Sequence, residues 1–405
     1  MNVELLAEML DHIVQEGHNL HSVLVMRHDV PVMDAYLYPH GPEVLHDLRS
    51  VAKSIISLLI GIAIDKGYLA GLEVPVLDFF PRRTFAHPDE RKEAITLSHL
   101  LTMTSGLALT DPDTGLMRQS PDWVGFVLDR PMAAAPGGRF QYATGNVHLL
   151  SAILQQATGQ SARAFAREYL FSPLGITDLR WGSDPQGVTA GMDLFLTPRD
   201  MAKIGTLMLH GGWWEGRRIV SAAWVKMSTR PHVTLEGRAG YGYLWWAYDR
   251  GYYAAHGFGG QHIFVLPKRD VVAVFTGGLK QREPSLPQEL LERYILPAAR
   301  ADGLPARVES LHGVFNVPDP EPVPSLPDAA RTIGGRTYAL TANAFGWERI
   351  TFTFTAGANV AYVSVNDQPG VPLGLDGVYR ITAGGKFIHW LPFTLPVALK
   401  GHWED

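Results

Sequence analysis

Cysteine is absent from the 405 residues, and basic residues nowhere gather into a long run. Without cysteine the chain forms no disulfide, no thiolate metal site and no cysteine nucleophile. The formal net charge is −5, whereas a nucleic-acid surface needs clustered Lys and Arg to neutralise phosphates. We therefore expect no nucleic-acid partner.

Long apolar runs are also missing. The most apolar stretch, Ile55 to Ile64, is ten residues long and contains Ser57 and Gly61, whereas a membrane span needs about 20 apolar residues. We therefore expect a buried core helix there and no membrane partner. Residues 1–16 predict an amphipathic helix without the basic, apolar and small-residue parts of a secretory leader. These features favour a cytoplasmic protein.

The order of the predicted elements indicates an α+β fold. Alternating apolar residues predict a hairpin over 22–33, and an apolar helix over 50–66 ends at Gly67. Residues 97–227 are mostly helical, strands follow at 241–246, 252–256, 261–266 and 271–276, and a helix covers 287–296. Strands at both ends predict one antiparallel sheet flanked by helices, with a helical subdomain between them.

A proline-rich passage divides the chain. Pro318, Pro320, Pro322, Pro324 and Pro327 follow one another at short intervals, which is typical of a stiff extended linker. We therefore predict a first domain over 1–312, a linker over 313–333 and a small all-β domain over 334–405. The strands of the last domain are expected at 350–354, 360–365, 378–381 and 387–391.

The apolar helix opens with a serine and a lysine. Ser50 and Lys53 are three residues apart, so their side chains share one helix face, with Cβ atoms about 5–6 Å apart. A lysine in this position can take the proton of a serine nucleophile. The helix N-terminus adds backbone N–H groups that favour developing negative charge.

Two further segments carry candidate site residues. In the first, Tyr142 follows a Gly-rich turn and precedes a helix for which Thr144 or Asn146 could be the N-cap, so its phenol could relay a proton. In the second, residues 256–261 read His-Gly-Phe-Gly-Gly-Gln between two predicted strands. Glycines there indicate close approach of another backbone or a ligand, and a backbone N–H of this segment could form an oxyanion hole with that of Ser50.

Together, and in this order, the three segments resemble the active-site elements of serine β-lactamases and penicillin-binding proteins. The resemblance covers about residues 20–300 and includes the stretches 95–107, 196–205 and 241–246. It is closest to the class C-like branch, which includes family VIII carboxylesterases and 6-aminohexanoate-dimer hydrolases. This implies the β-lactamase/transpeptidase-like fold for the first domain.

The resemblance also implies the roles of the site residues. Ser50 would be the nucleophile, Lys53 the proton acceptor, and Tyr142 the residue that protonates the leaving group and activates water. The backbone amides of Ser50 and Phe258 would form the oxyanion hole, with Gly259 as the alternative to Phe258. The expected substrate-binding residues are Phe258, Gly259, His256, Gly257, Thr144, Asn146 and Trp245.

The chain departs from the class C pattern at two positions. Thr144 stands where Tyr-x-Asn has its asparagine, and His256 replaces the lysine of Lys-Thr-Gly. The first change removes an amide donor and the second removes a permanent cation for a substrate carboxylate. We therefore expect weak or absent β-lactamase activity, and hydrolysis of a carboxylic ester or small amide by a carboxylesterase-like enzyme.

Three alternatives stay open. The same scaffold serves amidases and peptidases, because acyl-enzyme chemistry accepts oxygen and nitrogen leaving groups. A non-catalytic binding protein could keep the fold, although it would not need all three catalytic residues. A metal hydrolase would need a ligand pattern such as HExxH, which the sequence lacks. No cofactor is expected, and a homodimer is compatible with the sequence. The last domain could cap the site or mediate dimerisation, and its composition favours neither role.

Overall fold

The computed structural model describes residues 1–236, 238–280, 283, 285–300, 311–323, 325–343, 345–385 and 395–403. They form two compact units, Met1–Ala35 with His46–Gly313 and Tyr36–Leu45 with Val314–Asp405. Residues 36–45, assigned above to the first domain, thus belong to the second unit. The predicted linker contains the last residues of one strand and the short helix α12 (Asp328–Ile333), which begins directly after Pro327.

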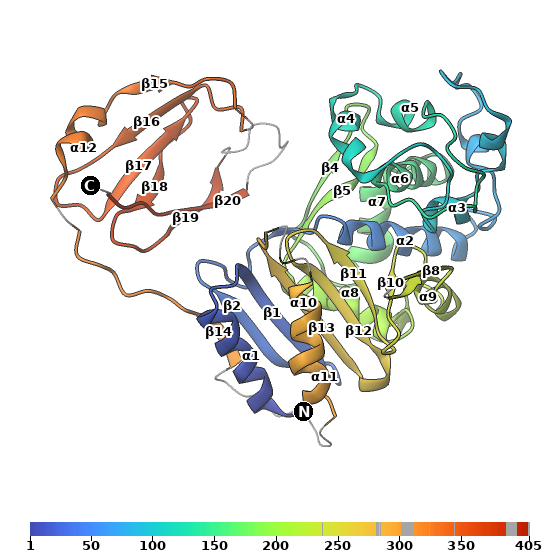
Figure 1. Cartoon of the computed structure of the whole chain (residues 1–405), viewed down its shortest axis with the longest axis horizontal. Helices are drawn as coiled ribbons and strands as arrows, with labels where there is room; N and C mark the ends of the chain where they lie inside the picture. The colour runs from blue at the N-terminus through green and yellow to red at the C-terminus, as the bar shows by residue number, and fades with distance from the viewer. Residues whose placement is uncertain are drawn as a thin grey trace. The chain divides into compact units, whose positions relative to one another are not determined.

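One antiparallel sheet organises the first unit (Figure 1). In spatial order its nine strands are β14 (His312–Phe315), β2 (Val30–Leu37), β1 (Leu20–Arg27), β13 (Val271–Gly277), β12 (Gln261–Leu266), β11 (Tyr253–Gly257), β10 (Trp246–Ala247), β9 (Arg238–Tyr241) and β8 (Val233–Leu235). β1 pairs with β13, so strands distant in sequence meet in the centre. The predicted α+β architecture is confirmed.

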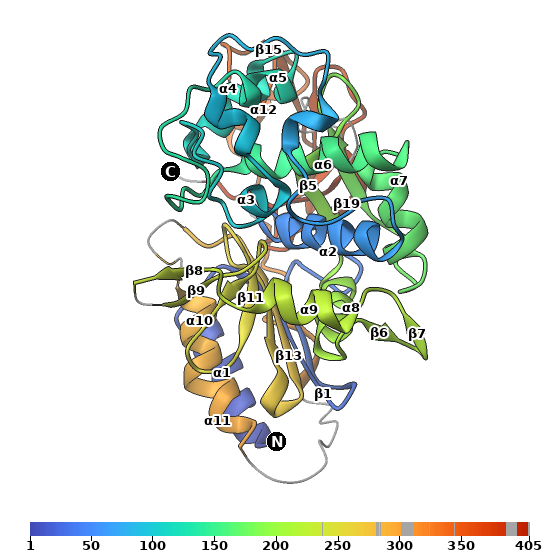
Figure 2. The same ribbon diagram turned by 90° about the vertical axis from the view of Figure 1, so that its right-hand side faces the viewer.

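Helices cover both faces of this sheet, which explains why β12 and β13 are buried along their whole length. On one side α1 (Val3–Gln15) packs against the segment made of α10 (Leu286–Leu290), η6 (Leu291–Ile295) and α11 (Leu296–Ala298). On the other side lie α8 (Pro198–Leu209) and the start of the helical part (Figure 2). No helix among the described residues is both long and apolar enough to cross a membrane.

The helical part contains the central helix α2 (Val51–Asp65), whose residues 51–63 are all buried. Around it lie α3 (Leu97–Leu101), α4 (Thr114–Gln119), α5 (Trp123–Leu128), α6 (Thr144–Thr158), α7 (Ala162–Ala166) and α9 (Ala222–Thr229). Short helical turns are η1 (Val76–Phe79), η2 (Glu90–Ala94), η3 (Asp111–Asp113), η4 (Arg167–Phe171) and η5 (Pro267–Arg269). Two small sheets complete this unit, β3 (His46–Asp47), β5 (Thr189–Leu196) and β4 (Arg180–Ser183) in one, and β6 (Trp213–Trp214) with β7 (Arg217–Arg218) in the other.

The predicted strand 241–246 is wrong in its centre. β9 ends at Tyr241 and β10 begins at Trp246, with a bend between them. Leu244 has a positive φ of 63°, and a Cβ on Gly242 would lie 2.1 Å from the carbonyl oxygen of Ser228. Tertiary packing against the end of α9 therefore bends the chain where the sequence pattern indicates a continuous strand.

The second unit carries two small antiparallel sheets, as expected for an all-β appendage. One contains β15 (Thr337–Ala339), β16 (Arg349–Thr353), β17 (Val360–Val365) and β18 (Val371–Gly374), and the other β19 (Arg380–Gly385) and β20 (Leu395–Leu399). Its core is formed by Val363, Val365 and Val371. The strand predicted over 387–391 lies outside the described residues.

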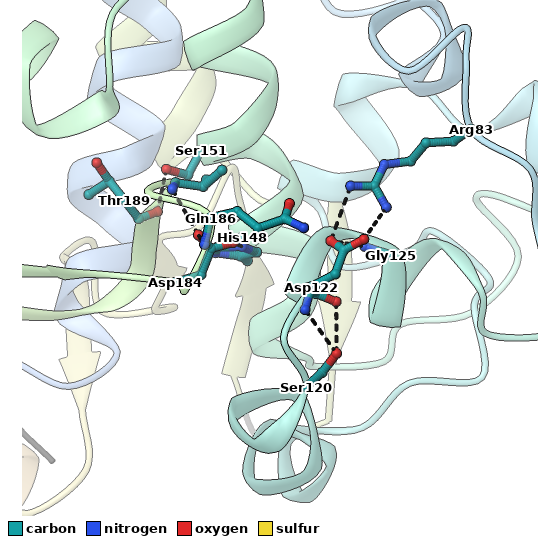
Figure 3. Close-up of polar contacts among 10 residues, drawn as sticks. Arg83, Ser120, Asp122, Gly125, His148, Ser151, Asp184, Gln186 and Thr189 are labelled. Atoms are coloured by element: carbon teal, nitrogen blue, oxygen red, sulfur yellow. Dashed lines mark hydrogen bonds and ion pairs between the residues drawn. The ribbon is translucent and has the colours of Figure 1, made fainter.

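A buried histidine–aspartate contact ties α6 to the hairpin of β4 and β5. His148 Nε2 lies 3.1 Å from Asp184 Oδ2, and both side chains are fully buried. The other carboxylate oxygen of Asp184 accepts two backbone N–H groups of its own loop. One helical turn after His148, Ser151 donates to the carbonyl of Thr189 at 2.6 Å (Figure 3). These two contacts, of His148 and of Ser151, therefore hold the orientation of α6.

Replacing His148 by alanine should lower the free energy of unfolding by about 3 kcal/mol, because it leaves the Asp184 carboxylate buried without this partner. Ser151→Ala, on the same face of α6, removes one neutral hydrogen bond and should cost about 1 kcal/mol. Urea unfolding of both variants measures the difference. A cost for His148→Ala no larger than for Ser151→Ala would contradict the importance of the pair.

Candidate active site

The turn before α2 positions Ser50. Arg49 has a left-handed backbone with φ of 51°, and both its N–H and its guanidinium contact the Asp47 carboxylate, at 2.9 and 3.0 Å. Burial raises the pKa of the Asp47 carboxyl, while the neighbouring Arg49 opposes that shift. Ser50 occupies the N-cap position of α2, yet its side chain makes no capping hydrogen bond. Its hydroxyl is therefore available for another partner.

That partner is Lys53, one helical turn further on. Lys53 Nζ donates to Ser50 Oγ at 2.7 Å, and the lysine is only 2% exposed. The same Nζ lies 5.0 Å from the centre of the Tyr142 ring. The structure thus brings together the three residues predicted to be catalytic, around a half-buried serine.

An aromatic cluster holds Tyr142 in this position. Its ring stacks on Trp246, with centroids 5.9 Å apart, and meets Tyr241 edge to face at 6.2 Å. Tyr241 is buried and also contacts Phe140. Burial raises the pKa of the Tyr241 phenol well above its usual range, and the charges of Tyr142 and Asp111 nearby add to this shift. Tyr241 is therefore a neutral support for Tyr142.

The end of β11 lies against the turn that precedes Ser50. A Cβ on Gly257 would lie 2.4 Å from the carbonyl oxygen of Leu48 and 3.3 Å from Cβ of Arg49. Glycine is thus required here by close backbone approach. The segment just before Ser50 and the segment just before Phe258 are therefore neighbours, which is the arrangement that an oxyanion hole from their two amides needs.

The hairpin after Gly257 is held from inside. Gly259 and Gly260 have φ of 82° and 94°, and Gln261 Nε2 donates to the carbonyls of Gly259 and Gly277, at 3.2 and 2.5 Å. Phe258 projects from this turn with 59% of its surface exposed. An exposed aromatic residue on a fixed turn is suited to contact an apolar part of a ligand.

His256 lies beside the same cluster. Its ring stacks on His262 with centroids 4.2 Å apart, and its centroid is 6.1 Å from that of Trp246. His256 is half-buried, whereas His262 is buried. The predicted substrate-binding position of His256 is therefore adjacent to the aromatic wall formed by Trp246 and Tyr142.

The side chains of Asn146 and Trp245, two of the predicted substrate-binding residues, are both buried, and their role stays a prediction. Asn146 accepts a hydrogen bond from Ser105 Oγ at 2.9 Å and joins α6 to that segment. Trp245 is fully buried and packs edge to face on Tyr253. Trp246, the residue after Trp245, stacks on the ring of Tyr142.

Thr144 binds an acidic residue that sequence reasoning missed. Its Oγ1 donates to Asp111 Oδ1 at 2.6 Å, and Asp111 is exposed at the start of η3. The two residues are 33 positions apart, so no local pattern could reveal the pair. The Asp111 carboxylate therefore lies beside the N-terminus of α6, which begins at Thr144, two residues after Tyr142.

The chain is similar to a family profile and to several known proteins. The profile of the family described as Beta-lactamase matches residues 7–294. The chain is 26% identical over 279 residues to 6-aminohexanoate-dimer hydrolase of Paenarthrobacter ureafaciens, covering 62% of this chain and 71% of the relative. It is 31% identical over 155 residues to esterase EstB of Burkholderia gladioli, covering 35% of this chain and 39% of the esterase. The octameric penicillin-binding protein homologue from Pyrococcus abyssi has the same fold, with a TM-score of 0.62 and 17% identity over 95% of this chain and 92% of that one.

Gly257→Ala should slow the reaction of Ser50 with a fluorophosphonate by about tenfold or more, because the added methyl group pushes β11 away from the turn that precedes Ser50. Gly115→Ala is the control, since a Cβ there has no neighbour within 4 Å. Intact-mass spectrometry over time gives the labelling rate, and thermal unfolding reports whether each variant is folded. Equal labelling rates for the two folded variants would contradict the role of the close contact.

Proposed function

This chain belongs to the Beta-lactamase family, and on that premise we propose that it hydrolyses a carboxylic ester or a small amide through an acyl-enzyme on Ser50. The observation that carries the proposal is the 2.7 Å contact between Lys53 Nζ and Ser50 Oγ on a buried helix, with Tyr142 beside the lysine. A serine hydroxyl in contact with the amino group of a buried lysine is suited to proton transfer.

In the proposed acylation step, Ser50 Oγ attacks the substrate carbonyl carbon while its proton passes to the Lys53 and Tyr142 pair. The carbonyl oxygen becomes an oxyanion that accepts hydrogen bonds from the backbone amides of Ser50 and Phe258. When the tetrahedral intermediate collapses, the bond to the leaving group breaks and Tyr142 supplies a proton to it. The close approach of Gly257 to Leu48 supports this assignment of the two amides.

Deacylation follows the same route with water as the nucleophile. Tyr142 takes a proton from water, whose oxygen attacks the acyl carbon and forms a second tetrahedral intermediate. Breaking the bond to Ser50 Oγ releases the carboxylic acid and returns a proton to the serine. The aromatic side chains of Trp246 and Phe258 would contact an apolar acyl group.

An ester is favoured over a β-lactam because the site offers little to bind a substrate carboxylate. His256 carries no permanent charge, and the exposed carboxylate of Asp111 repels an anion near Tyr142. The name of the relative 6-aminohexanoate-dimer hydrolase keeps a small amide as the second candidate.

Wild-type protein should form a single fluorophosphonate adduct and hydrolyse p-nitrophenyl butyrate. Ser50→Ala should abolish both, and Tyr142→Phe should lower kcat by about 100-fold or more, because it removes a proton carrier. Ser57→Ala is the matched control, since Ser57 is buried on the same helix, and it should retain the activity. Intact mass and the release of nitrophenol measure these outcomes. Folded wild-type protein with neither adduct nor turnover would favour the non-catalytic alternative.

Asp111→Asn should raise kcat/KM for an anionic ester, relative to a neutral ester of the same length, by roughly threefold, because it removes the repelling charge but keeps an acceptor for Thr144. A p-nitrophenyl glutarate monoester and p-nitrophenyl valerate form a suitable pair. Asp178→Asn removes one charge from another exposed carboxylate and should leave the ratio unchanged. A ratio that does not move in Asp111→Asn would rule out this source of substrate selection.

A further inference from the structure

A basic hollow lies at the end of the sheet remote from Ser50. It has a volume of about 360 Å³, and the described residues that line it include four cations, Arg250, Lys268, Arg269 and Arg300, and one carboxylate, that of Glu292. β11 runs from Tyr253 near the hollow to Gly257 beside the turn that precedes Ser50, a length of about 13 Å at the usual rise per residue. The hollow is therefore separate from the proposed active site.

Three chain segments bring these cations together. Arg250 comes from the turn between β10 and β11, Lys268 and Arg269 from η5 between β12 and β13, and Arg300 follows α11. Figure 1 shows the turn between β12 and β13 and helix α11 towards the same end of the sheet. Like charges gathered in a concave site repel one another, so the arrangement is stabilised when an anion occupies it.

The single carboxylate already has partners. Glu292 Oε1 accepts hydrogen bonds from Tyr252 Oη at 2.7 Å and Gln288 Nε2 at 3.1 Å, and Oε2 lies 3.5 Å from Arg250 Nη1. Within the described residues, no ion pair engages the other three cations. Asp249 and Asp270 are adjacent in sequence but do not line the hollow, and the Asp270 carboxylate binds His28.

The surplus of about three positive charges stands out in a chain whose net charge is −5. One carboxylate ligand would neutralise only a third of it, whereas linked phosphates carry several negative charges and oxygens in pairs that suit guanidinium groups. Leu266, Leu296 and Pro297 add an apolar side to the same hollow. The ligand therefore needs several phosphates and has room for a small organic part.

We propose that this hollow binds a soluble small molecule that carries two or more phosphate groups. The arginine and lysine side chains hold the phosphate oxygens, and the apolar side accommodates the organic part. Bound ligand would join the β10–β11 turn, η5 and the residue after α11, which are otherwise separate segments.

Calorimetric titration of the full chain with inorganic tripolyphosphate, and then with adenosine triphosphate, tests the proposal in magnesium-free buffer at two salt concentrations. Wild-type protein should bind with a Kd in the micromolar range that rises with salt. Lys268→Gln combined with Arg269→Gln should weaken binding by about 100-fold, since each of the two charged hydrogen bonds lost costs about tenfold. Arg217→Gln combined with Arg218→Gln is the control on another exposed hairpin and should bind as the wild type does.

Ser50→Ala should bind both phosphates unchanged, and Lys268→Gln with Arg269→Gln should keep the ester turnover, because the two sites are separate. Absence of binding at millimolar tripolyphosphate would overturn the proposal. So would an equal loss of affinity in the Lys268→Gln, Arg269→Gln variant and in the Arg217→Gln, Arg218→Gln control. Binding confined to vesicles that contain phosphatidylglycerol, with none to either soluble phosphate, would also overturn it and indicate a lipid headgroup instead.

Discussion

The candidate active site depends on the close packing of the end of strand β11 against one backbone carbonyl. Gly257 at the end of β11 comes so close to Leu48 that a methyl group would stand 2.4 Å from its carbonyl oxygen. This contact joins the central sheet to the turn that precedes α2, and through that turn to Ser50. Because a larger residue would clash there, close backbone packing sets how Ser50 and the 258–260 hairpin lie relative to each other.

Burial of α2 then determines the chemistry available to Ser50. Every residue from 51 to 63 is buried. Lys53 is therefore only 2% exposed, and its amino group donates a hydrogen bond to the serine hydroxyl. After the bend at residues 242–245, the ring of Trp246 stacks on that of Tyr142. The centre of the Tyr142 ring lies 5.0 Å from Lys53 Nζ. Hydrophobic packing of a helix and an aromatic cluster thus supports a small polar group that would otherwise be solvated.

The charges around this site differ from those at the far end of the sheet. Near Tyr142 the exposed group is the Asp111 carboxylate, whereas at the opposite ends of β11 and β12 the exposed groups are mostly guanidinium and ammonium. A chain with a modest net charge therefore presents local fields of opposite sign to different ligands. The fold separates the two groups of charges by the length of the strands.

Much of the fold could be predicted from the sequence, because its signals lie within single elements. The apolar run after Lys53 predicts a buried helix, and β12 and β17 have the predicted bounds. Ser50 and Lys53 are paired by helical spacing alone, and Gly257 is recognisable as a site of close approach because few other reasons place glycine in a buried strand.

Other features depend on contacts between distant segments. Trp245 is buried in the core whereas Trp246 stacks on Tyr142, and the hydrogen bond from Thr144 to Asp111 joins residues 33 positions apart. The four cations of the basic hollow likewise come from three turns that are separate in sequence. The sequence by itself determined which residues share a helix face or a strand, since that follows from local periodicity, whereas the tertiary structure decided which of them meet, because packing alone brings remote segments together.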